Sequence, residues 1–259
     1  MVRDSTAWQV TLHTVFKLAK NAQLGGLLHH SIAGRLVRSN TNPGPDRKAQ
    51  PMPAAAANGK GDAARTRVLA AFTESVATKG YAATTIADVV ALAHVSRRTF
   101  YEHFADKESA LLASHEEFRA DVIATVSKAS EIGETTAERI ESTITALLQV
   151  LSDSPAATKT HFVETLGAGP RAREARREMQ RSFVALLISL AERAYQRNPA
   201  VRELSPEMAT AVTGGLTELI VQAAEEERLA DLLRLSDTMI ALVSSAFLGV
   251  PSWELTRRK

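Results

Sequence analysis

Apolar residues recur every three or four positions along most of the chain after residue 62, which is the spacing of one buried helix face. No segment in this part alternates strictly between apolar and polar residues, as a half-buried strand does. Residues that begin or end helices separate the periodic segments. The pattern predicts an all-α protein of about nine helices.

Four of these helices are predicted before residue 130. The first has an apolar face followed by a glycine stop: Val68, Leu69, Phe72, Val76 and Gly80. Thr85 and Asp88 have the spacing of a capping box for a short second helix that ends at about residue 93. Ser96 can cap a third helix, which ends near residue 104, and Asp106 can cap a fourth that reaches the 120s.

Five further helices are predicted downstream, at about residues 135–152, 156–166, 171–197, 206–227 and 230–247. Most of the breaks between them contain glycine or proline, which end or open helices. The breaks lie at Gly133, Pro155, residues 167–170, residues 198–199 and residues 205–206.

The first 62 residues follow a different pattern. Residues 1–38 have a loose helical periodicity with basic and almost no acidic side chains, and residues 40–62 are rich in Pro, Gly, Asn and Ala. Nothing periodic in the second stretch can bury itself, so it predicts a linker. The first stretch has three interpretations: an amphipathic helix that binds a surface, a targeting segment, or a poorly ordered extension without a function of its own.

Composition narrows the class of protein. The 259 residues are 45% hydrophobic and include no cysteine, so the chain can build a core but no disulfide, thiolate metal site or cysteine nucleophile. No run approaches the roughly 18 apolar residues of a membrane span, and we expect a soluble, cytoplasmic protein. Residues 1–107 carry fourteen basic and seven acidic residues, whereas the rest carries seventeen and twenty-two. This division predicts a polyanionic partner for the first part.

Residues 85–104 have the layout of two short helices that meet across a tight turn at His94 and Val95. In such a pair the second helix can lie in the major groove of DNA while the first crosses the phosphate backbone. The apolar members are expected to form a small core: Val89, Ala93, Val95, Phe100 and Phe104.

The first turn of the second helix carries the candidate base readers, Arg97, Arg98 and Thr99. Arginine can donate two hydrogen bonds to guanine O6 and N7, which makes it suited to this position. Tyr101 and His103 lie farther along and can donate to phosphate oxygens, and Lys107 adds a cation at the start of the next helix. Each of these residues alone is typical of a solvated helix face, but together they predict nucleic-acid binding.

Residues 63–112 resemble the N-terminal DNA-binding domain of the tetracycline-repressor (TetR) family of bacterial regulators. The resemblance rests on a first helix with its phenylalanine, the glycine and tyrosine at residues 80–81, the two threonines at 84–85 and the string VSRRTFYEHFADKESAL at 95–111. It departs at His94, where most relatives have glycine. Histidine tolerates a positive φ better than a β-branched residue does.

The resemblance implies residue roles and an organisation for the whole chain. It implies phosphate contacts from Thr85, Tyr101, His103 and Lys107, and base contacts from Arg97, Arg98 and Thr99. It also implies a homodimer, a small-molecule effector and repression as the commoner mode. We expect an extension and linker at 1–62, a helix-turn-helix domain at 63–107, a ligand-binding and dimerisation domain at 108–250 and a tail at 251–259.

A symmetric dimer is also expected from the DNA, because specific sites usually contain two half-sites about 34 Å apart. The last two predicted helices carry apolar stripes that could pair with their symmetry mates in a four-helix bundle. The stripes comprise Met208, Val212, Gly215, Leu216 and Leu219, then Leu232, Leu235, Met239 and Val243. Alternatively, both stripes pack inside one subunit.

The middle helices are the candidate site for a small molecule, because apolar walls with a few polar groups are typical of ligand cavities. The candidates are His115, Phe118, Val122, His161, Phe162, Thr165, Met179, Phe183 and Leu187. The same pattern is also typical of an ordinary core, in which His115 would be a satisfied core histidine, and His161 could be a surface histidine.

Two other classes of function compete with DNA binding. An enzyme is disfavoured because no phosphate-binding loop and no nucleophile beside a base is recognisable, so no catalytic residue, metal or cofactor is predicted. The second competing class is a helical interaction module that binds a membrane surface through residues 1–38. We predict a sequence-specific DNA-binding regulator, a repressor that releases its operator when a small molecule binds the C-terminal domain.

Overall fold

The computed structural model describes residues 54–249, which contain nine α-helices, two 3-10 helices and no strand. The predicted all-α fold is confirmed for this part of the chain. The elements are α2 (Ala54–Lys79), α3 (Ile86–Ala93), α4 (Arg97–His103), α5 (Lys107–Ala129), α6 (Thr136–Ser152), α7 (Pro155–Phe162), η2 (Glu164–Gly167), α8 (Pro170–Arg197), α9 (Pro206–Glu225), η3 (Leu229–Leu235) and α10 (Ser236–Leu248). The interpretations of residues 1–38 and 251–259 lie outside the described residues.

The starts of the short helices follow the predicted caps. The hydroxyl of Thr85 accepts a hydrogen bond from the Asp88 amide at 3.2 Å, and that of Ser96 accepts one from the Thr99 amide at 3.0 Å. The Asp106 carboxylate accepts from the Ser109 amide at 2.6 Å. These N-terminal caps place the first residues of α3, α4 and α5 where the sequence predicted them.

The turn between α3 and α4 is left-handed at His94, where φ is 52° and ψ is 48°. Its amide donates to the carbonyl of Ala91, and the following amide of Val95 donates to Val90 at 3.1 Å. Histidine adopts this conformation with less strain than a β-branched residue would. The position that departs from the family glycine therefore keeps the backbone geometry of a tight turn.

Three boundaries differ from the predictions. Helix α2 begins at Ala54, inside the predicted linker, because a run of four alanines favours helix despite the glycines that follow. The helix predicted at 156–166 ends at residue 162, where η2 follows. The first part of the helix predicted at 230–247 is the 3-10 helix η3, in which Leu229 and Leu232 both face the core; a spacing of three residues matches its turn.

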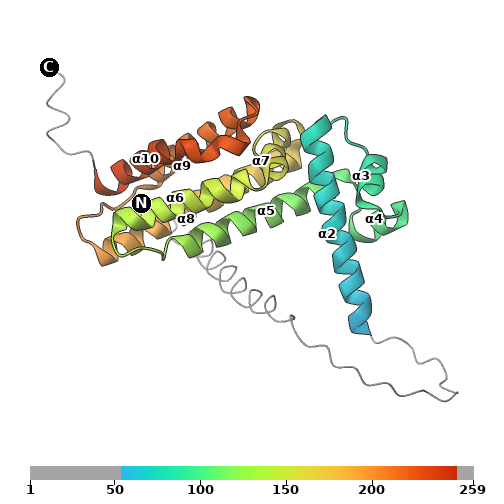
Figure 1. Ribbon diagram of the computed structural model, residues 1–259, viewed down its shortest axis with the longest axis horizontal. Coiled ribbons are helices and arrows are strands. Elements are labelled where there is room, and N and C mark those ends of the chain that lie inside the picture. The colour runs from blue at the N-terminus through green and yellow to red at the C-terminus, as the bar shows by residue number, and fades with distance from the viewer. Residues whose placement is uncertain (1–53, 250–259) are drawn as a thin grey trace, which may run out of the picture.

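The buried side chains form two clusters. The smaller cluster lies among α2, α3, α4 and the start of α5, and it contains Phe72, Val89, Phe100 and Phe104. The larger cluster fills the bundle of α5 to α10. Figure 1 shows α2 crossing one end of this bundle, with α3 and α4 beside it. The predicted small core behind α4 is thus confirmed.

Helix α5 belongs to both clusters. Leu111 is buried in the smaller cluster, and Phe118 and Val122 are buried in the larger one. One continuous helix therefore joins the two parts of the molecule, and the division at residue 107 stays a prediction. Within residues 54–249 no helix is long and apolar enough to cross a membrane.

Candidate functional site

Helix α4 presents its cationic first turn to solvent because its apolar residues hold its opposite face. Phe100 and Phe104 are buried with their ring centroids 5.6 Å apart. The side chain of Arg98 is 89% exposed, and its Nε donates to Glu102 Oε1 at 3.1 Å. Arg97 is exposed and has no ion-pair partner within residues 54–249. The structure therefore brings the two predicted arginine readers together on one exposed turn.

The remaining α4 candidates differ in how much of each side chain is available. The hydroxyl groups of Thr99 and Ser96 lie 2.9 Å apart in a hydrogen bond, so Thr99 takes part in the helix cap. Tyr101 is 55% exposed, with its ring edge against Phe100. His103 is half-buried beside Phe104. Their contacts with DNA stay predictions.

Thr85 caps α3 with all of its donors. Its amide and its hydroxyl both donate to Asp88 Oδ2, at 2.9 and 2.7 Å. Hydrogen bonds from Lys79, at 2.6 Å, and from Thr85 lower the pKa of the Asp88 carboxyl to about 2. Both N–H and O–H donors of Thr85 are therefore already bound to the ionised Asp88 carboxylate. For the predicted contact with a DNA phosphate, Thr85 would have to break one of these two hydrogen bonds.

Lys107 has a structural role that the sequence did not reveal. Its Nζ donates to the carbonyls of Tyr81, at 2.8 Å, and Thr84, at 2.9 Å, and lies 4.2 Å from the centre of the Tyr81 ring. It thereby closes the turn between α2 and α3. An ammonium has three N–H groups, so one remains for the predicted phosphate contact.

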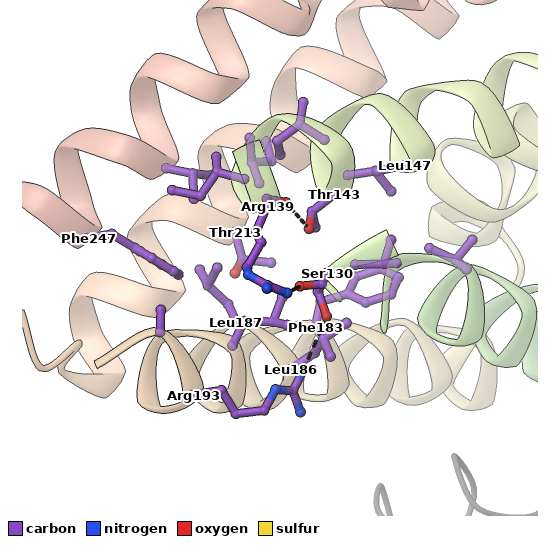
Figure 2. Close-up of a pocket in the computed structure, with 18 of the residues that line it drawn as sticks. Ser130, Arg139, Thr143, Leu147, Phe183, Leu186, Leu187, Arg193, Thr213 and Phe247 are labelled. Carbon is purple, nitrogen blue, oxygen red and sulfur yellow. Dashed lines mark hydrogen bonds between the residues drawn. The ribbon is translucent and has the colours of Figure 1, made fainter. Parts of the chain in front are cut away.

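A deep cavity lies inside the bundle, between α5, α6, α8, α9 and α10 (Figure 2). Its volume is about 120 Å³. Four predicted pocket residues line it, namely Val122, Phe162, Phe183 and Leu187. The other five do not line this cavity but are buried in the protein, and their predicted ligand contacts stay predictions: His115, Phe118, His161, Thr165 and Met179.

Two walls of the cavity were missed by the sequence analysis. Helix α6 contributes Ile140, Ile144 and Leu147, and α9 and α10 contribute Ile220 and Phe247 among others. The periodic apolar face of α6 was visible in the sequence as a helix signal. Periodicity alone does not say whether a face meets another side chain or an empty space, so this wall needed the tertiary structure.

The predicted dimer stripes are largely buried within the described chain, and their role at a subunit interface stays a prediction. Five of their side chains are buried within the chain itself: Val212, Leu216, Leu232, Met239 and Val243. Two of these, Leu216 and Val243, line the cavity. Met208 is 50% exposed, whereas Gly215, Leu219 and Leu235 are half-buried. Only these four retain surface for a partner.

His115 and His161 form a buried polar cluster beneath the cavity. Their Nδ1 atoms lie 3.3 Å apart, and His161 Nε2 lies 3.1 Å from the Ser114 hydroxyl, which in turn bonds Thr73 of α2 at 3.0 Å. His161 is thus a core histidine, not a surface one. His115 is only partly satisfied, because its buried Nε2 has no hydrogen-bond partner within residues 54–249.

Burial lowers the pKa of His115 and lowers that of His161 to about 3. Unfolded histidine titrates near pH 6.5, so the unfolded state binds more protons below that pH. We expect the free energy of unfolding to be highest above about pH 6.5 and to fall toward pH 3, by up to about 1.4 kcal/mol per pH unit for His161.

Urea denaturation between pH 7.5 and 4.5 measures this slope. Replacing His161 by glutamine is expected to flatten it, while replacing the exposed His94 by asparagine, which tolerates the left-handed turn, should leave it unchanged. An unaltered slope in the His161→Gln protein would contradict the assignment of the buried neutral histidine.

An exposed cationic helix, joined by a left-handed turn to a second capped helix and backed by its own apolar cluster, defines a helix-turn-helix DNA-binding protein. Residues 68–113 match the model of the family described as bacterial regulatory proteins, tetR family. The chain thus carries, at residues 68–113, the DNA-binding domain of TetR-family regulators. Regulators of the family are non-enzymatic, so the enzyme alternative is not supported. They bind operator DNA, act as homodimers and bind small-molecule effectors, which are the partner classes predicted from the sequence.

Solved structures share the fold over most of their length. FadR from Bacillus subtilis, in complex with stearoyl-CoA, is 19% identical with a TM-score of 0.62, and the match covers 72% of this chain and 99% of that one. FadR from Bacillus halodurans is 16% identical with a TM-score of 0.64, covering 70% and 94%. NemR of E. coli in its reduced form is 20% identical with a TM-score of 0.56, covering 73% and 100%. The comparison with curated proteins found no match.

Proposed function

We propose that the protein is a cytoplasmic, dimeric repressor that releases its operator when a small molecule occupies the cavity of the helical bundle. The observation that carries the proposal is the course of α5, which begins beside the reading helix and ends in the cavity wall. Lys107 at its start closes the α2–α3 turn, and Val122, Val126 and Ser130 farther along line the cavity.

A second connection runs through α7 and η2. Phe162 lines the cavity, and two residues later the Glu164 carboxylate accepts a hydrogen bond from the Tyr81 amide at 3.1 Å. Thr160 donates to the carbonyl of Thr73 on α2 at 3.2 Å. The elements that hold the DNA-binding end in place are therefore the same elements that a bound molecule would touch.

This arrangement supports a repressor controlled by one conformational equilibrium. A ligand that prefers one placement of α5 and α7 changes the orientation of α2 to α4, and DNA that prefers the other placement competes with it. We expect a coupling of about 1–3 kcal/mol, which corresponds to roughly a five- to 150-fold change in operator affinity. A regulator of this fold, FadR of B. subtilis, was solved in complex with stearoyl-CoA, which supports a ligand-binding role for this protein.

The DNA-binding part of the proposal assigns base contacts to Arg97, Arg98 and Thr99. Tyr101 and His103, farther along α4, contact phosphates of the DNA backbone. A homodimer places two such helices on neighbouring half-sites of DNA, about one helical turn apart. Residues up to 107 make the DNA contacts, and residues 108–250 bind the ligand and the second subunit.

Selection of genomic fragments by the full-length protein tests this proposal. We expect a short inverted repeat to be enriched, and its protection from cleavage to show two half-sites. Compounds related to the genes beside that site are then titrated into the protein–DNA complex. Ligands that bind the protein while leaving operator affinity unchanged would contradict ligand-controlled release, and enrichment without any shared sequence would contradict specific recognition.

A further inference from the structure

One end of the cavity is cationic, although the rest of its wall is mainly apolar. Arg139 on α6 and Arg193 and Arg197 on α8 all line it, together with neutral hydroxyl side chains, and no acidic side chain does so within residues 54–249. This end lies at the part of the bundle farthest from α3 and α4 (Figure 1). The cavity therefore has an apolar interior and a positively charged end, called the mouth below, where the side chains of Arg139, Arg193 and Arg197 are 22%, 32% and 44% exposed.

A single carboxylate faces the three guanidinium groups. Glu131 lies 2.7 Å from Arg197, 3.7 Å from Arg193 and 3.8 Å from Arg139, measured between nitrogen and carboxylate oxygen. The side chain of Glu131 is 52% exposed and does not line the cavity. The Glu138 carboxylate also acts electrostatically on Arg139, so three positive charges face two negative ones and the mouth keeps a positive excess.

At the mouth, Arg139 and Arg193 make only long hydrogen bonds, whereas Arg197 Nη2 donates to Glu131 Oε2 at 2.7 Å. Arg139 Nη1 donates to the Ser130 carbonyl and Arg193 Nη2 to the Ser130 hydroxyl, both at 3.4 Å. Each guanidinium carries five N–H groups, and good hydrogen bonds to oxygen are shorter than these. Figure 2 shows Arg139 reaching from α6 toward Ser130, beside Leu187. A second anion would find several donors already directed at it.

The apolar part of the lining extends along two helices, which suits a chain-like group. Along α8 the lining runs from Phe183 to Arg197, and 14 residues of helix span about 21 Å. The opposite wall is the apolar face of α6, from Ile140 to Leu147. Phe162 lines the cavity on α7, next to the elements that hold the DNA-binding end.

We infer that the ligand is an anionic amphiphile with one long acyl chain, whose head binds Arg139, Arg193 and Arg197 and whose tail extends along α8. The inference rests on the proposed function, since it names the ligand class of the same cavity. The acyl tail is apolar and packs against the apolar wall of the interior without leaving a buried polar group unpaired. The anionic head accepts hydrogen bonds from the three arginines, either beside Glu131 or in its place. The head is either a carboxylate or a phosphate group, and the binding experiment below distinguishes the two.

Binding to the full-length protein is measured by calorimetry with four probes. Palmitate carries a carboxylate head, palmitoyl-CoA carries phosphates, methyl palmitate carries the tail without charge, and CoA carries the phosphates without the tail. We expect one of the two anionic long-chain probes to bind at least about tenfold more tightly than methyl palmitate, because hydrogen bonds to charged groups are the stronger ones. CoA alone is expected to bind weakly.

Charge-removing variants assign the head to the mouth. Arg139→Gln and Arg197→Gln are expected to weaken the anionic probe by about tenfold or more and to leave methyl palmitate unchanged. Glu131→Gln removes the competing carboxylate and is expected to strengthen the anionic probe. Arg177→Gln is the matched control, because that α8 arginine is exposed, pairs with Glu174 at 2.5 Å and does not line the cavity.

The outcomes separate the ligand class from the proposed function. Equal binding of acid and methyl ester, arginine variants that change neither, or no binding of any long-chain probe would overturn the inference. Release of the operator by an uncharged ligand of the same cavity would then still uphold the proposed function. Binding that follows the arginines without any effect on operator affinity would uphold the inference and overturn ligand-controlled release.

Discussion

Replacing Phe100 by alanine is expected to destabilise the DNA-binding end of the protein by about 3–5 kcal/mol and to abolish operator binding. Phe100 is fully buried, and its ring packs against those of Phe104 and Tyr101 at centroid distances of 5.6 and 5.5 Å. Its removal leaves a cavity at the centre of the small cluster that packs α2, α3 and α4 together. Because that cluster is what orients α4, the arginines of its first turn lose their fixed direction.

Urea denaturation and operator binding measure the two effects together. Leu92→Ala is the matched control, since Leu92 also carries a large apolar side chain on the same unit but is 49% exposed. Surface changes of this kind usually alter stability by less than about 0.5 kcal/mol. A Phe100→Ala protein that keeps both its stability and its operator affinity would show that α4 is held by something other than this cluster.

Replacing Arg97 by alanine is expected to reduce operator affinity by about ten- to 100-fold and to relax the preference for one base pair. Arg97 has no ion-pair partner within residues 54–249, so it can approach DNA without losing one. Arg98 must first give up Glu102, but both side chains are more than half exposed, and such surface pairs contribute only about 0–1 kcal/mol. We therefore expect Arg98→Ala to have a similar or slightly smaller effect.

Fluorescence anisotropy on the operator and on single-base variants of it provides the measurement. Glu102→Gln removes a negative charge beside the DNA and is expected to strengthen binding to all sequences alike. Arg173→Ala is the control for the two α4 arginine variants, because Arg173 is exposed on α8 and its replacement changes the net charge by the same amount as theirs. If Arg97→Ala and Arg98→Ala weaken binding to specific and non-specific DNA equally, these arginines make general electrostatic contacts with DNA and do not read bases.

Short-range features of the DNA-binding end were predictable because their partners lie close in sequence. The caps at Thr85, Ser96 and Asp106 each join atoms three residues apart, so residue types at fixed spacing are sufficient evidence. The small core behind α4 followed from helical spacing across one tight turn. The left-handed residue His94 was expected at the same place, since the turn between two capped helices leaves few alternatives.

Contacts over long distances in sequence were not predictable from pattern. The Lys107 ammonium reaches carbonyls 23 and 26 residues away. The three arginines of the mouth meet Glu131 because α6 begins and α8 ends beside the loop between α5 and α6. The stripe on α9 and α10 has the same periodicity whether it faces a partner or the chain's own core. The structure shows that Leu216 and Val243 are buried within the chain, which no periodicity could have indicated.

The amino-acid sequence by itself determined the all-α class, the caps and turn of the helix-turn-helix unit, and the cationic tip of α4, because these depend on propensity, spacing and neighbours within a few residues. Only the tertiary structure decided which apolar faces enclose a cavity, which histidines are buried and where the arginines of the mouth converge. Those features depend on the relative placement of helices distant along the chain, which the packing of their side chains sets and which a periodic pattern leaves open.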